Sequence, residues 1–414
     1  MKKLKIGIFG VGRGMDFVRD FMMLNCEICA ICDNHAERRE KAAKELGNSV
    51  AVYDNFDEFI EHDLDAVILA NFFHEHAPYA IKCLERGIHV FSECISNGTM
   101  AEGIELIRAA EKSDAIYMLA ENYPHMKFNR EIKRICDSKT LGKILYAEGE
   151  YNHPGPAGDV ESMKKHNYFT GHWRNFLPRT YYITHSLGPV MYATGATPKI
   201  VSAHATFAPT LDENTPTASC VGDKVAIIMT KNDDGSVFRV TGHASFGARE
   251  ESYRVCGTNG QIENIRGMGN KVMLRYNPWS LPEGAHETSL YEPEWNDPDE
   301  KFIMPSGHGG GDYLTARMFV ECIREGKQPE HPFSVHSAVA MSSVAILAHR
   351  SVLEGGKAYE IPDFREEKWV KEYENDRLTP FLGENGEAAS LPCCSVTDFA
   401  PMESQIEKYK ELIK

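Results

Sequence analysis

The sequence predicts an α/β protein of two domains, a doubly wound parallel sheet followed by an α+β domain with a mostly antiparallel open sheet. Three observations predict this fold class. Short apolar runs alternate with amphipathic stretches over the first 120 residues, and a glycine-rich segment follows the first run. Residues 123–360 instead hold alternating stretches separated by turn signals. The length, 414 residues, also exceeds what one hydrophobic core organises.

The first domain, residues 1–122, is predicted from apolar runs that are typical of buried parallel strands. These strands are expected at Leu4–Phe9, Glu27–Cys32, Ala66–Leu69, His89–Phe91 and Ile116–Leu119. Amphipathic stretches between them predict helices at about residues 15–24, 36–46, 76–86 and 100–112. Gly47 and Gly87 follow two of these helices and are predicted to cap their C-terminal ends.

The second domain is predicted over residues 123–361, with a C-terminal extension over residues 362–414. Alternation at Val225–Thr230, Val237–Ala244 and Ser252–Val255 predicts strands with one buried face. The extension is polar until a last helix at about residues 402–413, and it carries no recognisable chemistry.

Composition excludes several classes of function. A net charge of −15 argues against a nucleic acid or an anionic membrane as partner. The first nine residues become strand-like too quickly for a signal peptide, and eleven cysteines lack a compact framework, which predicts reduced thiols in a cytoplasmic protein. A strand would place Cys26, Cys29 and Cys32 on alternating faces, so we predict no metal there or elsewhere.

The glycine-rich segment predicts a dinucleotide site of the Rossmann type. It reads Gly10-Val11-Gly12-Arg13-Gly14-Met15, with its third glycine displaced from the usual spacing. Asp33 ends the second predicted strand, where a carboxylate accepts hydrogen bonds from a ribose diol and repels a 2′-phosphate. We therefore predict NAD rather than NADP, although Arg13 leaves NADP open, and a glycine turn without a ligand is the plain alternative.

A second informative segment is Tyr182-Ile183-Thr184-His185-Ser186-Leu187-Gly188-Pro189. If it opens a helix, Tyr182 and His185 share one face and reach the same small substrate. A phenol and an imidazole so placed are a proton-transfer pair. The alternative is a core histidine that bonds a backbone carbonyl.

Residues 64–76 and 87–95, with Leu141-Gly142-Lys143-Ile144 and the segment 253–260, resemble the Gfo/Idh/MocA oxidoreductase family. The resemblance covers about residues 1–360. It implies a nicotinamide cofactor, whose cleft Asn71, His76 and Glu93 line on the nicotinamide side. Cys94 and Asn122 also fall among the implied cofactor-binding residues.

One departure from this family is chemically important. The family carries a Glu-Lys-Pro triplet, but this sequence reads Glu93-Cys94-Ile95. A thiol is a weak hydrogen-bond donor and is mostly neutral at pH 7, so it cannot supply the ammonium of a lysine. Either ordinary dehydrogenase chemistry is absent, or it has moved to other residues.

The segments 118–122, 148–153 and 182–190 narrow the resemblance to NAD-dependent glycosidases, the α-N-acetylgalactosaminidase-like subgroup. It implies that Glu121, Tyr151, Tyr182 and His185 are active-site residues. Ile183 stands in place of the subgroup's proline, and residues 154–173 match poorly, so the sugar is left open.

Such enzymes oxidise a sugar hydroxyl, commonly at C3, eliminate the aglycone, add water and reduce the ketone again. We expect His185 to accept the hydroxyl proton and Glu121 to orient it or a sugar hydroxyl. Tyr151 and Tyr182 are candidates for the C2 base, which needs a phenolate of lowered pKa; each could instead only bind a hydroxyl. Glu121 has a plain alternative as a helix cap.

Further substrate contacts are predicted with less support. They are His153, Trp173, Arg174 and His308. His308 lies in a glycine-rich segment before an amphipathic helix, where it would touch sugar or nicotinamide, and Asp312 has the position of a helix N-cap. A flexible connector explains the glycines almost as well.

Three functions follow from these observations. The first is an NAD-dependent glycosidase, the second a sugar or polyol dehydrogenase, and the third a cofactor-binding sensor. The predicted partner is a small carbohydrate or glycoside. The resemblance further implies a homodimer or homotetramer, built through the open sheet of the second domain.

Overall fold

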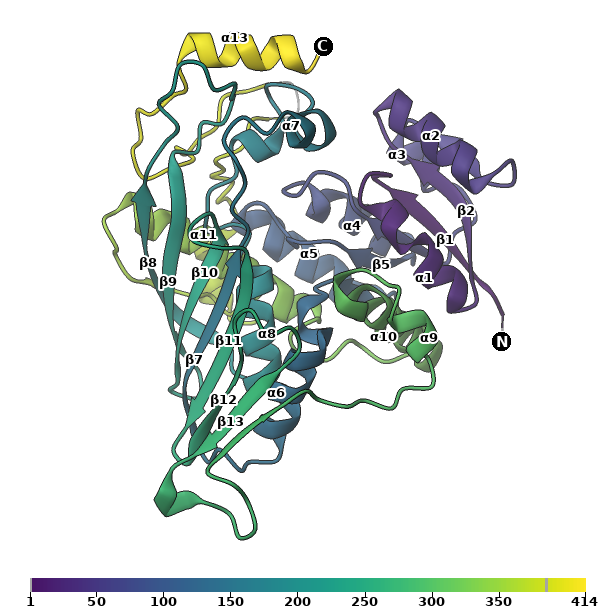
Figure 1. Ribbon diagram of the computed structural model, residues 1–414. Coiled ribbons are helices and arrows are strands. Elements are labelled where there is room, and N and C mark those ends of the chain that lie inside the picture. The colour runs from purple at the N-terminus through teal and green to yellow at the C-terminus, as the bar shows by residue number, and fades with distance from the viewer. Residues whose placement is uncertain (1, 384–385) are drawn as a thin grey trace.

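The computed structural model describes residues 2–383 and 386–414. Its N-terminal sheet is fully parallel, with the strand order β3-β2-β1-β4-β5-β6 (Figure 1). The strands are β1 (Leu4–Phe9), β2 (Cys26–Cys32), β3 (Ala51–Tyr53), β4 (Ala66–Leu69), β5 (His89–Ser92) and β6 (Tyr117–Leu119). The order reverses between β1 and β4, and ligands bind at the carboxyl ends of strands beside such a reversal. The predicted doubly wound sheet is confirmed.

Helices cover both faces of this sheet. They are η1 (Gly14–Phe17), α1 (Val18–Met23), α2 (Ala36–Leu46), α3 (Phe56–Phe59), α4 (His76–Glu85) and α5 (Met100–Lys112). The predicted elements lie within a few residues of the observed ones. We did not predict β3 and α3, which have three and four residues and are too short to show a period.

The second sheet has nine strands in the order β14-β13-β12-β11-β7-β10-β9-β8-β15. They are β7 (Ile144–Asn152), β8 (Pro198–Phe207), β9 (Asp223–Asn232), β10 (Val237–Ala244), β11 (Glu250–Gly257), β12 (Gly260–Asn264), β13 (Val272–Tyr276), β14 (Thr288–Tyr291) and β15 (Tyr359–Glu360). All neighbouring strands are antiparallel except β7 and β10. The predicted antiparallel open sheet is therefore confirmed.

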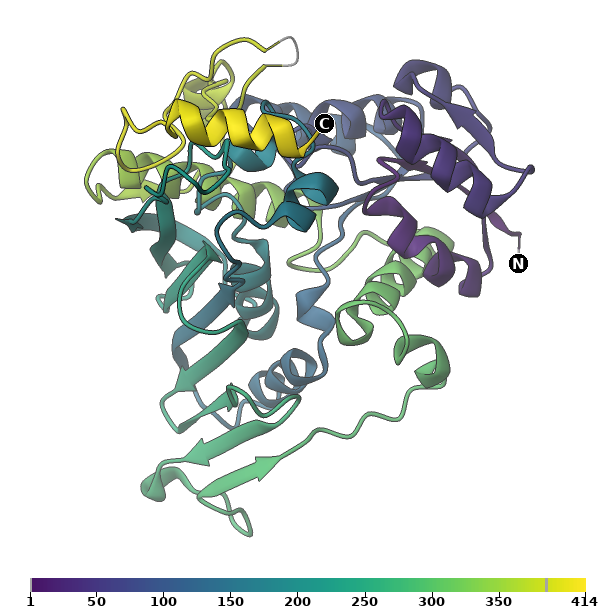
Figure 2. The same ribbon diagram turned by 45° about the horizontal axis from the view of Figure 1, so that its top comes forward.

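Helices α6 (Lys127–Asp137), α8 (Thr184–Thr194) and α11 (Val335–Leu353) lie on one face of this sheet (Figures 1 and 2). Helix α8 packs directly on β7, because Gly149 has no side chain: a Cβ there would lie 2.0 Å from the Ser186 carbonyl oxygen. This close contact brings the start of α8 against the inner face of β7.

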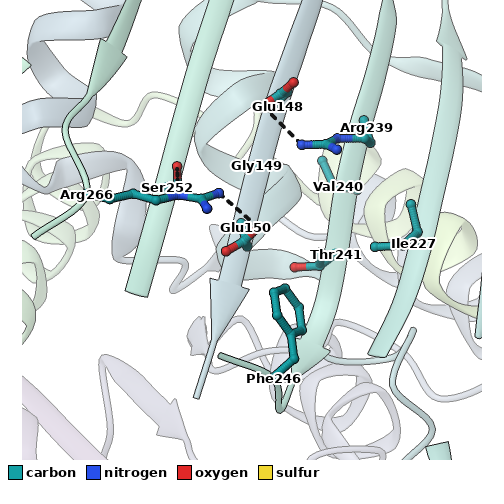
Figure 3. Close-up of a pocket in the computed structure, with 10 residues that line it drawn as sticks. All are labelled: Glu148, Gly149, Glu150, Ile227, Arg239, Val240, Thr241, Phe246, Ser252 and Arg266. Carbon is teal, nitrogen blue, oxygen red and sulfur yellow. Dashed lines mark hydrogen bonds and ion pairs between the residues drawn. The ribbon is translucent and has the colours of Figure 1, made fainter. Parts of the chain in front are cut away.

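The opposite face of the second sheet carries no helix and is open (Figure 1). In β9, Ile228 is fully buried while Ile227 and Met229 are 39% and 47% exposed. A hollow on this face is lined by charged, polar and apolar side chains from four strands and two loops (Figure 3). Two ion pairs cross it, Glu148 with Arg239 at 3.2 Å and Glu150 with Arg266 at 3.1 Å.

The remaining helices are mostly short and lie in connections, apart from α10, which has 15 residues. They are η2 (Tyr123–His125), α7 (Val160–His166), η3 (Trp173–Asn175), η4 (Pro278–Ser280), α9 (Glu300–Ile303), η5 (His308–Gly310), α10 (Gly311–Glu325), α12 (Glu367–Tyr373) and α13 (Glu403–Leu412). No helix in the described ranges is both long enough and apolar enough to span a bilayer.

Helix α10 returns to the first domain, although it lies outside the range predicted for it. Phe319 of α10 packs its ring edge-on to Phe21 of α1, with centroids 6.3 Å apart, and it also contacts Phe91 of β5 at 5.3 Å. All three rings are fully buried. This return places the loop before α10 beside the glycine-rich loop after β1.

The C-terminal extension folds back on the second domain. Gln405 of α13 donates hydrogen bonds to the carbonyl oxygens of Thr210 and Asp212, at 3.1 and 2.9 Å. Asp376 forms a bidentate ion pair with Arg350 of α11, at 2.6 and 2.7 Å. The extension thus closes one end of the second domain near α7 (Figures 1 and 2).

Candidate active site

A buried carboxylate stands at the carboxyl end of β6. Glu121 has no exposed surface, and its oxygens lie 2.9 and 3.0 Å from Nδ1 of His185. The thiol of Cys94 donates to Glu121 Oε2 at 3.2 Å, and the Tyr123 amide donates to Oε1 at 3.1 Å. The three donors together fix the orientation of the carboxylate.

Glu121 is held in its ionised form. Burial raises the pKa of this carboxyl, but the charge and hydrogen bond of His185, helped by smaller hydrogen bonds, outweigh burial and lower it overall. Because an ionised carboxylate can only accept, Nδ1 of His185 carries a proton when it bonds Glu121. With Nδ1 bonded to Glu121, Nε2 is the ring nitrogen left to exchange a proton with a substrate.

Three tyrosine rings surround the His185 imidazole. Tyr123 stacks on it with centroids 4.0 Å apart, and Tyr151 and Tyr182 approach edge-on at 4.8 and 5.0 Å. The prediction that Tyr182 and His185 share a helical face is wrong in detail, because α8 begins at Thr184 and Tyr182 lies in the preceding bend. The bend, rather than a helical turn, brings the two rings together.

The state of the tyrosines differs from the expected phenolate. Burial raises the pKa of Tyr151 and raises that of Tyr182 further, while Arg174 acts in the opposite direction on both. In this structure both side chains are therefore neutral phenols at pH 7. They are hydrogen-bond donors, and a role as base requires further positive charge.

Cys94 stands where the family resemblance places a lysine. Its thiol is buried, and burial raises its pKa well above the usual value, with Glu121 adding to the effect. Its Sγ, an oxygen of Glu121 and a ring nitrogen of His185 lie within 4.8 Å of one another, and this donor set suits zinc. However, the Glu121 oxygens lie 2.9 Å from Nδ1 of His185 and 3.2 Å from Sγ of Cys94, and both are hydrogen-bond distances. We therefore describe the three side chains as a hydrogen-bonded triad.

The glycine-rich loop has the form that a dinucleotide needs. Gly10 has φ +91°, and a Cβ there would lie 2.3 Å from the Ala70 carbonyl oxygen. A Cβ on Gly14 would lie 2.4 Å from Ile8 Cγ2, so the displaced third glycine still permits close helix–strand packing, with Met15 half-buried beside it. A Cβ on Gly12 would have one near neighbour among the described residues, a nitrogen of the Arg38 guanidinium at 3.3 Å.

Asp33 lies at the end of β2, as predicted, and supports the loop. Its Oδ2 accepts the Val11 amide at 2.9 Å and its Oδ1 accepts the His35 amide at 2.8 Å. Each oxygen keeps a second lone pair. The carboxylate is thus fixed beside the loop, where a ribose would lie in a dinucleotide-binding fold.

Three of the residues predicted to bind the cofactor have buried polar atoms without a partner in the described part of the chain. Asn71 Oδ1, His76 Nε2 and Asn122 Oδ1 are buried without a hydrogen-bond partner within the described residues. Hydrogen bonds through other atoms fix the side chains of His76 and Asn122. His76 Nδ1 lies 2.9 Å from the Ile95 carbonyl oxygen, and Asn122 Nδ2 donates to Asp312 at 2.6 Å. Buried polar groups are rarely left unpaired, so these residues fit a bound polar group such as a nicotinamide cofactor.

Arg13 joins the glycine-rich loop to two acidic side chains. Its guanidinium donates to Glu93 at 2.8 Å and, through two nitrogens, to Asp312 at 2.8 and 3.0 Å. Asp312 also lies 3.1 Å from Nδ1 of His308. The prediction of Asp312 as the helix N-cap is wrong: Gly310 caps α10, and the carboxylate serves Arg13, Asn122 and His308 instead.

The predicted substrate residues lie close to the tyrosine rings around His185, either in contact with one of them or linked to one through neighbouring side chains. Trp173 stacks on Phe73 with centroids 5.1 Å apart, and the Arg174 guanidinium lies 4.4 Å above the Trp173 ring. The His153 ring lies 4.5 Å from that of Tyr151, and its Nε2 is 3.0 Å from Glu251. The structure therefore brings the predicted residues to one region.

The segment 154–173, which departs from the resemblance, bridges the two domains. The Arg38 guanidinium of α2 lies 4.2 Å above the ring of Tyr168 and donates to the Lys165 carbonyl oxygen at 2.7 Å. His35 contacts the same ring edge-on at 4.7 Å. This bridge lies next to Gly12 and so borders the cofactor cleft.

Sequence reasoning missed Tyr123, the pairing of Arg13 with acids, and the role of Asp312. No motif marks Tyr123, which only follows Asn122. The spacing of His308 and Asp312, four residues apart at a helix start, was a usable signal. Their pairing with Arg13 could not be read from the sequence, because it depends on the return of α10.

Two family models cover most of the chain. The oxidoreductase family with an NAD-binding Rossmann fold, Gfo/Idh/MocA, matches residues 4–121. A second model, described as the C-terminal domain of glycosyl hydrolase 109, matches residues 131–371. The chain belongs to glycosyl hydrolase family 109. This confirms the resemblance, and it makes the protein a carbohydrate-active enzyme of the Gfo/Idh/MocA type with a nicotinamide cofactor.

Curated relatives of this family 109 protein align over nearly their whole length. Glycosyl hydrolase family 109 protein 2 of Shewanella sp. (strain ANA-3) is 26% identical, covering 89% of this chain and 87% of its own. The α-N-acetylgalactosaminidase of Shewanella oneidensis is 25% identical, covering 89% and 86%.

Solved structures share the fold of the family 109 protein at lower identity. Levoglucosan dehydrogenase in complex with NADH and L-sorbose has a TM-score of 0.72 at 18% identity, covering 88% of this chain and 100% of its own. The myo-inositol 2-dehydrogenase of Lactobacillus plantarum has a TM-score of 0.64 at 20% identity, covering 87% and 100%. These matches support the assigned two-domain fold.

Proposed function

We propose that the protein is an NAD-dependent glycosidase that cleaves its substrate without net oxidation. The Glu121–His185 pair carries this proposal, because it supplies a base beside the cofactor cleft while Cys94 removes the family's lysine. When bound, NAD supplies the reversible oxidation of a sugar hydroxyl, which we place at C3. The relatives named for glycosyl hydrolase activity support this function.

Proton transfer from the hydroxyl is assigned to His185. Its Nε2 accepts the proton, and Glu121, bonded to Nδ1, stabilises the resulting imidazolium. Tyr123 holds the plane of the ring by stacking on it. The same imidazolium returns the proton when the ketone is reduced at the end of the cycle.

The elimination requires a second base. The C3 ketone acidifies C2–H, and loss of that proton expels the aglycone from C1 before water adds back. Tyr151 and Tyr182 are the candidates, and each needs cationic neighbours to reach the phenolate form. Arg174 lowers the pKa of both phenols, and Arg249 also lowers that of Tyr151.

For the cofactor we propose NAD rather than NADP. The carboxylate of Asp33 is fixed beside the loop by the amides of Val11 and His35. A 2′-phosphate at the adenosine ribose would meet this charge. Arg13, the alternative phosphate ligand, is neutralised by Glu93 and Asp312.

The test is incubation with a panel of aryl glycosides and catalytic NAD⁺ in D₂O. We expect aglycone release without accumulation of NADH, and deuterium at C2 of the released sugar. His185→Ala should nearly abolish release and leave NAD affinity unchanged. Stoichiometric NADH without aglycone release would contradict the proposal.

A sugar or polyol dehydrogenase is the second candidate. It is favoured by the fold shared with levoglucosan dehydrogenase, solved with NADH. The same panel decides between the two, because a dehydrogenase produces one NADH for each sugar oxidised. A cofactor-binding sensor would bind NAD and turn over neither class of substrate.

A further inference from the structure

The last part of the C-terminal extension lies beyond the range that the family 109 model matches. That model ends at residue 371, and residues 372–414 follow it. Three aromatic side chains of this part are nonetheless buried, since Tyr373, Phe381 and Tyr409 are 8%, 1% and 1% exposed. The described residues of this part are thus packed into the protein, and helix α13 lies next to α7 (Figures 1 and 2).

Helix α13 holds both ends of residues 167–175, which we call the wall segment. The Tyr409 hydroxyl donates to the Asn167 carbonyl oxygen and accepts from Nδ2 of Asn175 at 3.4 Å. The Asn175 side chain is buried as well, and its Oδ1 accepts from Nδ2 of Asn167 at 3.0 Å. Its Nδ2 also donates to the Thr170 carbonyl oxygen at 3.1 Å. One buried hydroxyl therefore ties the first and last residues of the wall segment together.

A second contact of the extension borders the same cleft. The Phe381 ring stacks on the imidazole of His74, with centroids 4.3 Å apart and an angle of 20° between the planes. His74 lies in the loop between β4 and α4, which also carries Asn71. The other contact of the Phe381 ring is edge-on to Tyr181 at 5.4 Å, and Tyr181 directly precedes Tyr182. The extension thus reaches both the cofactor side and the tyrosine side of the cleft.

The wall segment carries one aromatic and one cationic side chain towards the tyrosines. The Trp173 ring stacks on Phe73, and the Phe73 ring contacts that of Tyr182 at 5.2 Å. Arg174 is accessible to solvent, yet desolvation by its surroundings lowers the pKa of its guanidinium, as expected for a side chain inside a cleft. Its charge in turn lowers the pKa of the Tyr151 and Tyr182 phenols. The position of the wall segment therefore sets the position of this charge.

We propose that the C-terminal extension positions the wall segment for the elimination step, with Tyr409 as the positioning residue. This inference rests on the glycosidase function proposed above. Asn175, which Tyr409 holds, is the residue directly after Arg174. The segment 154–173 is also where the chain departs from its family resemblance. Two parts of the chain without a counterpart in that resemblance thus meet in one buried contact.

The proposed role is confined to one step of the reaction. In the elimination, a phenolate takes the C2 proton, the C2–H electron pair forms the C1–C2 double bond, and the C1–O pair leaves with the aglycone. A guanidinium held near the phenol favours the phenolate that this step needs. Hydride transfer at C3 is assigned to the Glu121–His185 pair, which the described contacts of Tyr409 do not include. Loss of the Tyr409 hydroxyl should therefore slow elimination more than oxidation.

Other groups that face the two phenols stay in place when Tyr409 is changed, because other elements hold them. They are charged, titratable or aromatic side chains from both domains: Glu93, Cys94, Tyr123, His153, His185, His243, Arg249 and Glu251. Arg174 is the member of this surrounding set that belongs to the wall segment.

The test is Tyr409→Phe, which keeps the buried ring and removes only the hydroxyl. With an aryl glycoside that the wild type cleaves, we expect kcat and the rate of deuterium incorporation at C2 to fall about ten- to a hundred-fold, the effect of a small misplacement of a reacting group. The burst of enzyme-bound NADH in a single turnover should be as fast as in the wild type, and NAD affinity should be unchanged. Phe381→Leu, which removes the stack on His74, should give the same selective loss to a smaller extent.

The pH profile separates positioning from damage to the fold. If Arg174 moves away from the phenols, their pKa rises, so less phenolate is present at a given pH. The acid limb of the profile for deuterium incorporation should therefore shift to higher pH in Tyr409→Phe, and raising the pH should restore part of the rate. A damaged fold would lose all steps together and would not recover.

Tyr373→Phe is the matched control. It removes a hydroxyl from another buried tyrosine of the same extension, whose ring contacts Phe364 and Trp369 rather than the wall segment, and all rates should stay at the wild-type level. Wild-type kinetics in Tyr409→Phe would overturn the proposal, as would equal losses in the NADH burst and in deuterium incorporation. A wild-type enzyme that releases no aglycone would instead refute the proposed function, and this inference with it.

Discussion

At the scale of single residues, Glu121 explains most of the arrangement. It accepts hydrogen bonds from a thiol, an imidazole and an amide in a fully buried position. A lysine in place of Cys94 would direct an ammonium at the same carboxylate and compete with His185 for it. The cysteine donates one weak hydrogen bond and leaves the charge of Glu121 to the imidazole.

Glu121→Gln should therefore lower kcat about a thousand-fold or more, because an amide favours the wrong tautomer of the paired histidine. Binding of NAD, followed by fluorescence quenching, should be unchanged. Glu131→Gln is the control: Glu131 is also buried and ion-paired, with Arg134 at 2.6 Å, but it lies in α6 outside the triad. Full activity in Glu121→Gln would remove the carboxylate from the mechanism.

The same variant has an expected pH signature. The pKa of Glu121 is lowered on folding, so its ionised form adds stability above the unfolded value of about 4.3 and loses it as the pH falls through the folded value. The midpoint of thermal unfolding in the wild type should drop on acidification below about pH 4 more steeply than in Glu121→Gln.

The two candidate tyrosines show what residue-level reasoning lacks. The family resemblance located Tyr151 and Tyr182, and the structure brings both within 5 Å of His185. Their protonation could not be read from the sequence, because it depends on burial and on the distance to Arg174. A sequence motif identifies such residues, but it does not show how deeply each side chain is buried.

At the scale of elements, long periodic segments were predictable and short ones were not. Helix α5 keeps its helical period over 13 residues, and β1 and β4 are unbroken apolar runs that are recognisable as buried strands, whereas β3 is defined by its pairing with β2. The start of α8 was misjudged by two residues, because Tyr182 continues the polar pattern without adopting the helix. Tertiary contacts decide such boundaries.

Helix α10 is the element on which the cofactor side of the cleft depends. Phe319→Ala removes a fully buried ring between α10 and α1, which should cost about 3–5 kcal/mol of stability. We also expect weaker NAD binding, because α10 carries the Asp312 contact to Arg13. Chemical denaturation and a cofactor titration measure the two effects.

Trp279→Ala is the control for that change. The Trp279 side chain is 80% exposed in η4, so its removal should leave both quantities nearly unchanged. A Phe319→Ala variant with full stability would show that α10 does not support the first domain.

At the scale of the whole molecule, the open face of the second sheet is the main unexplained surface. The resemblance implies a homodimer or homotetramer. On this face the partly exposed Ile227 and Phe246 line the hollow together with charged side chains (Figure 3), and Met229, two residues after Ile227 in β9, is also partly exposed. Exposed apolar side chains grouped on a sheet face that no helix covers are typical of an interface. We expect a second copy of the chain to cover it.

Met229→Lys combined with Ile227→Lys should therefore reduce the oligomer to a monomer, as measured by light scattering after size exclusion. Leu211→Lys, at a position 70% exposed outside the sheet, should leave the assembly unchanged. A wild-type monomer at micromolar concentration would contradict the expectation.

The return of α10 also bears on how the chain can be divided. Residues 1–122 contain the six parallel strands and the glycine-rich loop. However, the buried rings of Phe17, Phe21 and Phe91 belong to a core cluster that also includes Phe319 and Val320 of α10. An N-terminal fragment cut at that point would expose this apolar surface to water and would tend to aggregate. The cofactor domain is thus completed by a segment synthesised almost two hundred residues later, and the protein can fold fully only after α10 has emerged from the ribosome.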